Sequence, residues 1–306
     1  MTSNPLKILI ISDGKPGHEN QSMGLAQAIN RHREALITKV APNPHAQSIA
    51  CLLFNKTPDA WQSIDPPDLC IATGSGTQFS LIAAKHYFGA YSVVLSGPSF
   101  PGHFFDLCVI PEHDGRTPKS NLIFTQGVLN KITPSEQGNP EKGLILIGGE
   151  SKHYQWDSIK IAKQIQHIVS SGPQIKWQAT NSRRTPEDLS LDINHSQVEF
   201  NFTPWQDTSP DWLPQQIAQA GQIWVTPDSV SMVYESLTSG NNVFLFDLPP
   251  LHTKVCNSIE KLRFSLTGGI RNGAICPPGN QTILWEADRV ATAVLEKLAS
   301  REQAGK

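Results

Sequence analysis

Nine residues near the start of the sequence, DGKPGHENQ, combine a tight turn with side chains that can transfer protons. An imidazole changes charge near neutral pH, so His18 could deprotonate an acceptor hydroxyl, and Glu19 or Asp13 could do so if desolvated. A turn and a helix capped by Asn20 would explain part of this segment, but a cap does not need so many polar groups. We therefore predict a catalytic and acceptor-side loop whose other members are Lys15, Gly17, Asn20 and Gln21.

Two further turns rich in small residues follow strand-like runs of the same half. They are Gly74-Ser75-Gly76-Thr77 and Ser96-Gly97-Pro98-Ser99. Small side chains let the backbone approach a ligand closely, although an ordinary structural turn explains both segments equally well. Of these residues, we assign Gly74 and Ser75 to the acceptor-side loop.

In the second half, the segments GGESKH and TNSRRTP also follow strand-like runs. Glycines followed by Ser151 and Lys152 at the entrance to a helix are suited to binding an anion. In the other segment, a guanidinium beside Ser182 is suited to recognising phosphate. Adjacent arginines point in different directions, so we expect only one of the pair, Arg183, to contact a ligand.

The segment TPDSVSMVYES predicts a helix that begins where a strand ends. Asp228 or Ser229 is expected to cap this helix, and its free first-turn N–H groups and dipole favour a diphosphate. Glu235 follows about two turns into the helix. Its carboxylate could accept both hydroxyls of a ribose; the alternative is an exposed helix glutamate without a role.

The pattern of the whole chain provides a scaffold for these segments. Short apolar runs alternate with segments of helical periodicity, which predicts parallel α/β sheets that bind ligands beyond the carboxyl ends of their strands. The fold class is α/β, with two Rossmann-like domains facing a cleft (1–135 and 143–284), a linker around 132–143 and a C-terminal helix over 285–306. Strands are expected over 6–11, 36–40, 69–72, 91–95, 107–110, 122–124, 143–147, 175–180, 198–202, 223–226 and 243–246, and helices over 21–33, 46–54, 79–88, 159–169 and 285–300.

Composition excludes several classes of protein. A net charge of −2 provides no polycationic surface for nucleic acid. None of the five cysteines forms a CxxC pair, and Cys70 and Cys108 lie in strand-like apolar runs, which indicates buried thiols in a reducing compartment. No apolar run of about 20 residues and no signal peptide is present, so we expect a cytoplasmic protein.

Phe100, Phe104 and Phe105 could contact the inner membrane peripherally, or pack between domains. The ten histidines are scattered, so we expect no metal ion and no cofactor.

Four segments, in order along nearly the whole chain, resemble the bacterial branch of the mitochondrial-fission (elongated-mitochondria) protein family. They are DGKPGHENQ, GGESKHYQW, TNSRRTP and VTPDSVSMVYES. The last also resembles the donor site of GT-B glycosyltransferases, among them the lipid-linked peptidoglycan N-acetylglucosaminyltransferase. This resemblance implies a GT-B-like fold, phosphate contacts at Ser229, Val230 and Ser231, and a ribose contact at Glu235.

Three functions remain open from the sequence. The first is a metal-independent GT-B glycosyltransferase of cell-envelope glycan synthesis. Its nucleotide-sugar donor would bind the second domain, where Ser151, Lys152, Ser182 and Arg183 join the phosphate contacts, and its acceptor, which could be lipid-linked, would bind the first. The second is a non-catalytic scaffold that recruits a partner at a membrane surface, as the plant members of the family indicate. The third is a nucleotide-sugar epimerase similar to the 2-epimerase of N-acetylglucosamine. Hydride transfer is disfavoured, because no GxGxxG follows a predicted strand.

Overall fold

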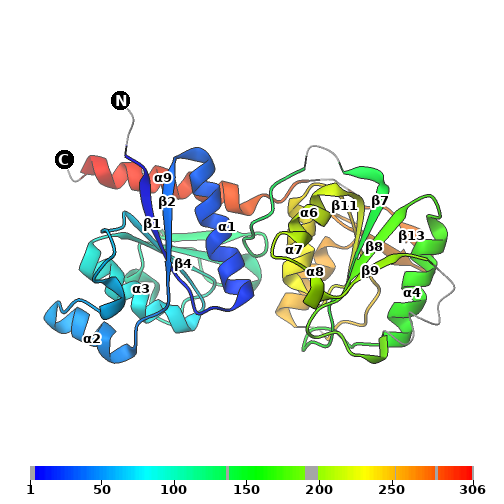
Figure 1. Cartoon of the computed structure of the whole chain (residues 1–306), viewed down its shortest axis with the longest axis horizontal. Coiled ribbons are helices and arrows are strands. Elements are labelled where there is room, and N and C mark those ends of the chain that lie inside the picture. The colour runs from blue at the N-terminus through cyan, green and yellow to red at the C-terminus, as the bar shows by residue number, and fades with distance from the viewer. Residues whose placement is uncertain (1–3, 136–137, 190–198, 252, 280–281, 305–306) are drawn as a thin grey trace. The chain divides into compact units, whose positions relative to one another are not determined.

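The structure is a computed structural model of the 306-residue chain and describes residues 4–135, 138–189, 199–251, 253–279 and 282–304. The chain forms two α/β domains, each built on its own sheet (Figure 1). The first domain comprises Met1–Lys131 together with Trp285–Lys306, and the second comprises Ile132–Leu284.

The sheet of the first domain is entirely parallel. Its strands are β1 (Leu6–Ile11), β2 (Ala35–Val40), β3 (Leu69–Thr73), β4 (Tyr91–Leu95), β5 (Leu107–Pro111) and β6 (Leu122–Thr125), in the spatial order β2-β1-β3-β4-β5-β6. Every residue of β3, β4 and β5 is buried. Their mostly apolar character follows from helices that cover both faces of the sheet.

Alternate residues of β1 pack into different halves of the core of this domain. Ile8 and Ile10 pack with apolar residues of two helices, whereas Leu9 and Ile11 pack on the other face with residues of two more. The helices of the first face are α1 (Pro16–His32) and α9 (Glu286–Ala304), and those of the second are α2 (His45–Phe54) and α3 (Ser75–Phe88). Single 3₁₀ turns lie at Asp59–Trp61, Gly102–Phe104 and Glu112–Asp114.

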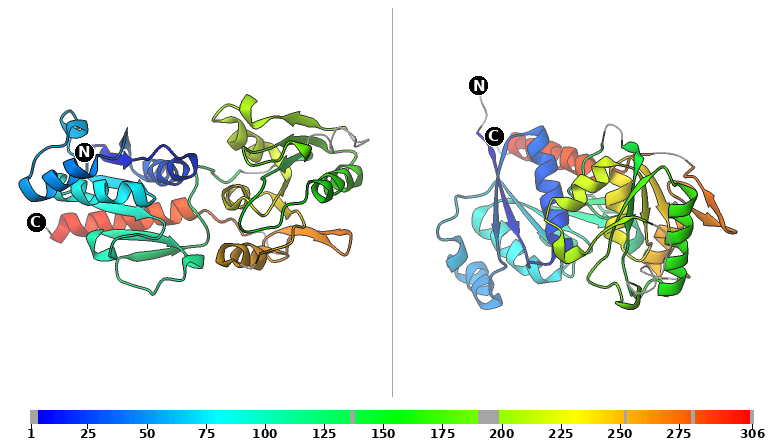
Figure 2. Two further views of the ribbon diagram at one scale, coloured as in Figure 1. Left: turned by 90° about the horizontal axis from the view of Figure 1, so that it is seen from below. Right: turned by 45° about the vertical axis from the view of Figure 1, so that its right-hand side comes forward.

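The C-terminal helix belongs to the first domain although the second domain precedes it in the chain. Val290 and Val294 of α9 are fully buried in the core that α1 also covers. At the surface of this contact, His32 Nε2 lies 2.9 Å from Asp288, and the Arg31 guanidinium lies 4.9 Å from the Trp285 ring. Both ends of the chain therefore lie at the first domain (Figure 2).

The sheet of the second domain has one antiparallel strand at its edge. Its strands are β7 (Asn139–Leu146), β8 (Lys176–Thr180), β9 (Asn201–Thr203), β10 (Ala220–Val225), β11 (Asn242–Leu245), β12 (Gly268–Arg271) and β13 (Ala274–Cys276), in the order β13-β12-β11-β10-β7-β8-β9, with β13 antiparallel. Its helices are α4 (Ser158–Ser171), α6 (Trp212–Gln219), α7 (Val230–Thr238) and α8 (Lys254–Leu262), and a 3₁₀ turn spans Trp205–Asp207. Trp224 is fully buried at the centre of the sheet and stacks on Phe244 at 4.8 Å.

Most of the expected strands and helices are confirmed, and β4 has the predicted bounds of 91–95. The linker expected over 132–143 is partly wrong, because β7 already begins at Asn139. The strand expected over 198–202 is observed from Asn201, while Val198 lies outside the described residues. Helices α6 and α8 and the β12–β13 hairpin were not predicted, because these elements are short or weakly apolar.

Each parallel sheet has a point where the order of its strands reverses. In the first sheet the chain passes from β1 to β2 on one side and then returns to β3 on the other side of β1. In the second sheet the same reversal lies between β7 and β10. Ligands of open α/β sheets bind outside the carboxyl ends of the strands at such points. We therefore expect ligand sites at the loops after β1 and β3, and at those after β7 and β10.

Candidate functional site

The polar segment after β1 forms the first turns of α1 rather than a loop. The helix begins at Pro16, and the residue at its cap position is Lys15, which makes no side-chain capping bond. Asn20 is therefore not the cap that the alternative, purely structural interpretation of this segment expects. Because proline at the first helical position already has helical φ, the helix starts early enough to place His18 and Glu19 in its first turn.

His18 and Asp13 form a hydrogen-bonded pair at the reversal point of the first sheet. Both carboxylate oxygens of Asp13 lie 3.0 Å from Nδ1 of His18, and Lys15 Nζ lies 3.2 Å from one of them. Burial raises the pKa of Asp13, but the hydrogen bonds from His18 and Lys15 outweigh it and leave that pKa below its ordinary value. A carboxylate on Nδ1 orients the ring and stabilises the imidazolium that forms when Nε2 takes a proton. No described residue bonds to Nε2, and the His18 side chain is 28% exposed.

Gly74, after β3, makes room for this imidazole. A Cβ atom at Gly74 would lie 2.3 Å from Cε1 of His18, and the backbone there has φ +88°. Both the close approach and the positive φ require glycine. Ser75, the other candidate of this turn, is the first residue of α3. The structure thus brings the predicted residues from the loops after β1 and β3 together.

Glu19 is engaged in a different set of contacts. Its carboxylate accepts hydrogen bonds from Lys39 Nζ at 3.0 Å and from the Ser12 hydroxyl at 2.8 Å. These two bonds, with Lys39 the larger contributor, lower the pKa of Glu19. The contacts stabilise Glu19 as a carboxylate, which makes it a weaker candidate than His18 for accepting a proton.

A strained serine lies on the far side of the same cluster. Ser96, the residue after β4, has φ +71°, a conformation that non-glycine residues rarely adopt. Its hydroxyl lies 3.3 Å from the amide oxygen of Gln21, one turn along α1 from His18. Strain of this kind persists where the surrounding structure fixes it, and it is concentrated at functional sites. From the sequence, this segment is predicted only as a turn of small residues, and the strain at Ser96 is not.

The loops after β7 and β10 pack against each other at the reversal point of the second sheet. The N–H of Gly149 donates to Asp228 Oδ2 at 2.9 Å, and the N–H of Gly148 donates to the Thr226 hydroxyl at 2.7 Å. A Cβ at Gly148 would lie 2.3 Å from the Asp228 carboxylate, and one at Gly149 would lie 2.1 Å from the carbonyl oxygen of Arg184. These two glycines are therefore needed for close packing between the loops.

Asp228 is a buried carboxylate, and this corrects the prediction that it caps α7. Its side chain is 1% exposed, and Oδ2 accepts from Arg184 Nη2 at 2.8 Å as well as from Gly149. Oδ1 has no hydrogen-bond partner among the described residues. Burial raises the pKa of Asp228, and the bonds from Gly149 and Arg184 offset only part of this effect.

The two adjacent arginines have different environments. Arg184 is bound to Asp228 and to the carbonyl oxygens of Gly149 and Glu150. Arg183 is exposed, and its guanidinium lies 5.5 Å from the ring centroid of Trp205, in the loop after β9. Trp205 was not predicted as a site residue, because a single aromatic residue in a short polar stretch gives no signal of its own. Ser182 is occupied with the carbonyl of Gly148 at 2.9 Å.

The first turn of α7 has no side-chain cap. Ser229 is the cap residue, yet its hydroxyl makes no capping bond, which corrects the other half of that prediction. Val230 and Ser231, in the first turn, are partly exposed. Glu235, in the last turn but one, is only 9% exposed, so it is not the solvent-exposed helix glutamate of the alternative interpretation.

The segment after β7 pairs with the loop after β11 and reaches the start of α8. Ser151 Oγ accepts from the N–H groups of His153 and Tyr154, and His153 Nδ1 lies 2.7 Å from the Thr253 hydroxyl, at the start of α8. Because β10 lies between β7 and β11, a segment that runs from β7 to the loop after β11 passes the carboxyl end of β10. Lys152, in the same segment, is exposed.

The aromatic residues considered for membrane contact have different environments. Phe105 is 2% exposed, so its part in the predicted contact is wrong, whereas Phe100 and Phe104 are 36% and 41% exposed. Phe100 stacks on Phe79 of α3 at 6.0 Å. Within the described residues, no helix has the length and apolar character needed to cross a membrane, and no three metal-ligating side chains gather.

Comparisons with known proteins agree with this architecture. The family described as Mitochondrial fission ELM1 matches residues 16–298. The uncharacterized protein RP120 of Rickettsia prowazekii (strain Madrid E) is 23% identical over 298 residues, which covers 80% of this chain and 84% of that protein. The structure of MurG from Acinetobacter baumannii aligns with a TM-score of 0.50 at 10% identity, over 97% of this chain and 100% of that chain. A Listeria monocytogenes protein described as a UDP-N-acetylglucosamine 2-epimerase aligns with a TM-score of 0.50 at 13% identity, over 84% and 82%. These structural likenesses establish a GT-B-like fold of two Rossmann-like domains.

Proposed function

The chain belongs to the mitochondrial fission ELM1 family, and from this premise and its two polar sites we propose that it is a glycosyltransferase that uses a nucleotide-sugar donor. The observation that carries the proposal is the uncapped first turn of α7 at the reversal point of the second sheet. The missing cap leaves its N–H groups for a ligand, and the helix dipole there favours a diphosphate.

Other groups around α7 fit the remaining parts of a nucleotide sugar. Lys152 is proposed to supply a cation for the diphosphate, and the Glu235 carboxylate is proposed to accept the ribose hydroxyls. Arg183 and Trp205 offer a stacked pair at the neighbouring strand ends, with donors and an aromatic face for a base or sugar ring. Ser151 and Ser182 support the loops around this site through the bonds that they already make.

His18 is proposed to be the base that activates the acceptor. The acceptor oxygen forms a bond to the anomeric carbon while the bond from that carbon to the phosphate oxygen breaks, and the nucleoside diphosphate leaves with the electron pair. The acceptor proton passes to Nε2 of His18, and Asp13 stabilises the resulting imidazolium. The N–H groups of α7 stabilise the charge of the leaving diphosphate.

A nucleotide-sugar epimerase is the second candidate. The Listeria protein that aligns with this chain carries that description, and an epimerase also needs a carboxylate and a histidine at its site. Both candidates require the same nucleotide site on the second domain and differ in their products.

The nucleotide site is tested by removing one N–H group from the start of α7. Proline is tolerated at the first position of a helix, so Val230→Pro deletes a single donor and retains the fold. The matched control is Lys254→Pro, at the first position of α8. Calorimetric titration with UDP, CDP, GDP and ADP should identify one preferred nucleotide. Loss of one charge-assisted hydrogen bond of about 1.5–3 kcal/mol should weaken its binding about 10- to 100-fold in the first variant only.

The reaction is tested by following UDP-N-acetylglucosamine with NMR. Release of UDP and free sugar, with water as the acceptor, supports a transferase, whereas a product epimeric at the sugar ring supports the second candidate. His18→Gln should slow release and leave nucleotide affinity unchanged, while His32→Gln at the other end of α1 should change neither. Failure of all four nucleotides to bind at millimolar concentration would contradict both candidates and favour the scaffold interpretation.

A further inference from the structure

The outer edge of the first sheet differs from the other sheet edges in the described part of the chain. β2 has six residues, whereas β6 has four and β9 and β13 have three each. Short edge strands, prolines and free lysines are the usual means of preventing a sheet edge from pairing with another chain. β2 contains no proline, and its one lysine, Lys39, is bound to Glu19 of its own domain.

The backbone groups of β2 alternate between the sheet and its outer edge. The carbonyls of Glu34 and Val40 accept hydrogen bonds from the β1 side, from Leu6 and Ser12. Even-numbered residues of β2 therefore direct their backbone groups towards β1, and odd-numbered residues direct theirs outwards. The outward N–H of Ala35 is taken by the Asn30 side chain at 2.8 Å.

The next two outward-directed residues, Ile37 and Lys39, form the part of this edge that can pair. From this geometry we propose that β2 is a dimerisation strand, and that it pairs with β2 of a second copy of this chain in antiparallel orientation. The proposal concerns the first domain alone and does not depend on the nucleotide site.

One register satisfies both the backbone and the side chains. With a two-fold axis at Thr38, Ile37 of each copy exchanges backbone hydrogen bonds with Lys39 of the other. The same register places Leu36 opposite Val40 of the second copy, and Thr38 opposite Thr38. Thr–Thr pairs and pairs of apolar side chains are favourable across antiparallel strands, and these positions are the closely spaced ones. No like charges oppose each other.

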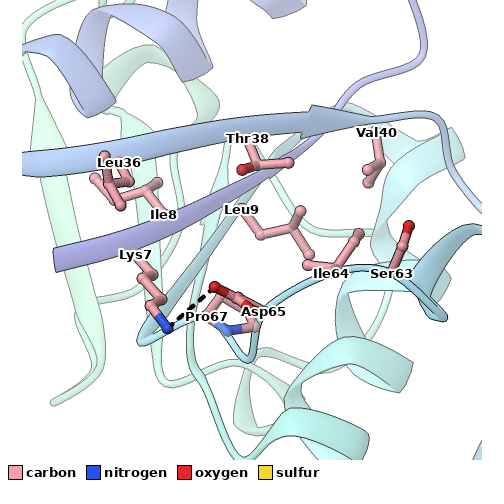
Figure 3. Close-up of a pocket in the computed structure, with 10 residues that line it drawn as sticks. All are labelled: Lys7, Ile8, Leu9, Leu36, Thr38, Val40, Ser63, Ile64, Asp65 and Pro67. Atoms are coloured by element: carbon pink, nitrogen blue, oxygen red, sulfur yellow. Dashed lines mark ion pairs between the residues drawn. The ribbon is translucent and has the colours of Figure 1, made fainter.

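The side chains in this register line a groove of about 430 Å³ beside β2 (Figure 3). Leu36, Thr38 and Val40 lie along β2 above Leu9 and Ile64. Leu36 is 56% exposed, which is unusual for a large apolar residue of a strand. Pairing with Val40 of the second copy would extend the sheet and cover Leu36.

A second copy fits this surface better than an unrelated chain does. A heterologous peptide needs only the backbone pattern, whereas here the side chains of β2 complement their own sequence about the two-fold axis. A symmetric interface uses the same patch on both subunits, so the side chains of one strand have to be complementary to those of an identical strand. The sequence LITKV from Leu36 to Val40 satisfies it at each position that faces the groove.

The experiment places like or opposite charges on the two-fold axis. Thr38 is exposed, so Thr38→Glu and Thr38→Lys can each be introduced without disturbing the core. The mass of the full chain in solution is measured by analytical ultracentrifugation over a dilution series. The wild type should approach twice 33.6 kDa at high concentration. Like charges opposite one another should raise the dissociation constant about tenfold in each variant. An equimolar mixture of the two variants should recover the dimer, because Glu then faces Lys.

Leu53→Ser on α2 is the control, since Leu53 is 70% exposed and distant in sequence from β2. This variant should remain a dimer. A wild-type protein that stays at 33.6 kDa at every concentration would overturn the proposal. So would a dimer that both Thr38 variants leave intact, or a mixture that does not recover it. Nucleotide affinity is measured separately on the same samples, so a failed dimer test leaves the nucleotide site unaffected.

Discussion

Replacing Arg184 by methionine should destabilise the second domain and make its stability depend on pH. The substitution retains the length and apolar part of the side chain and removes the guanidinium that binds Asp228 at 2.8 Å. Among the described residues, Asp228 is then left buried with only the neutral donors Gly149 N–H and the Thr226 hydroxyl beside it.

The expected loss in free energy of unfolding is set by the unequal exposure of the pair. The side chain of Arg184 is 42% exposed, while that of Asp228 is 1% exposed. Exposed ion pairs contribute up to about 1 kcal/mol, and breaking a fully buried pair costs about 3–5 kcal/mol. A half-exposed pair should fall between these values, at about 2 kcal/mol, which lowers the Tm of a domain of this size by roughly 4–8 °C.

The pH dependence follows from the raised pKa of Asp228. Because burial raises this pKa in the folded protein, ionisation of Asp228 favours the unfolded state. The penalty is absent below the ordinary value of 3.8 and grows as pH rises towards the folded-state value. Removing Arg184 raises the folded-state pKa further. The variant should therefore lose most stability at neutral pH, and its difference from wild type should shrink as pH falls.

Urea unfolding followed by tryptophan fluorescence measures this effect, since five of the seven tryptophans lie within Ile132–Leu284. Arg183→Met is the matched control, because Arg183 stacks on Trp205 and forms no ion pair with a described residue. Adding Asp228→Asn to Arg184→Met should recover part of the loss, since a neutral amide costs less to bury. An equal loss in both arginine variants, or a loss in Arg184→Met that does not change with pH, would refute the reasoning.

Three further predictions concern single positions. Ser96→Gly should raise the free energy of unfolding by about 1 kcal/mol, because glycine adopts the positive φ without strain, whereas Ser96→Ala should not raise it. Thermal melting measures the difference, and equal melting temperatures of the two variants would contradict the role of strain. Gly149→Ala should lower the free energy of unfolding by about 1–3 kcal/mol, because its Cβ would meet backbone atoms. The control, Gly17→Ala in α1, has open space around it and should leave the free energy of unfolding unchanged or slightly higher. A Gly149→Ala variant as stable as the wild type would contradict the close packing. Because the pKa of Glu19 is lowered in the folded protein, its ionisation stabilises the fold above pH 4.5, and this stabilisation is lost as the pH falls through the lowered pKa. Lys39→Met removes the ion pair that lowers this pKa, so near-UV circular dichroism should show acid unfolding at a higher pH than in the wild type. An unchanged transition would contradict the role of the ion pair.

The sequence predicted local features well and spatial neighbours poorly. β4 and its buried neighbours are continuous apolar runs, and such runs identify strands covered on both faces. Asp228 looked like a helix cap because aspartate beside a helix start is common. Its actual partners, Gly149 and Arg184, lie 79 and 44 residues away, so no local pattern could show that its carboxylate turns back into the loops.

The proposed site shows the same division. Asp13 and His18 are five residues apart, and the polar run DGKPGHENQ indicated both as candidates, although not that they form a pair. The contact between His18 and Gly74 joins loops that only the strand order brings together. Trp205 and the strain at Ser96 depend on the three-dimensional path of the chain, and residue type alone gives no sign of them.

A crystal structure of the full chain with the nucleoside diphosphate that binds most tightly tests the central claim most directly. The account predicts phosphate oxygens within hydrogen-bonding distance of the N–H groups of Val230 and Ser231, with the ribose hydroxyls on the Glu235 carboxylate. A diphosphate bound elsewhere, or a first turn of α7 that remains unoccupied at saturating nucleotide, would contradict the assignment of the donor site.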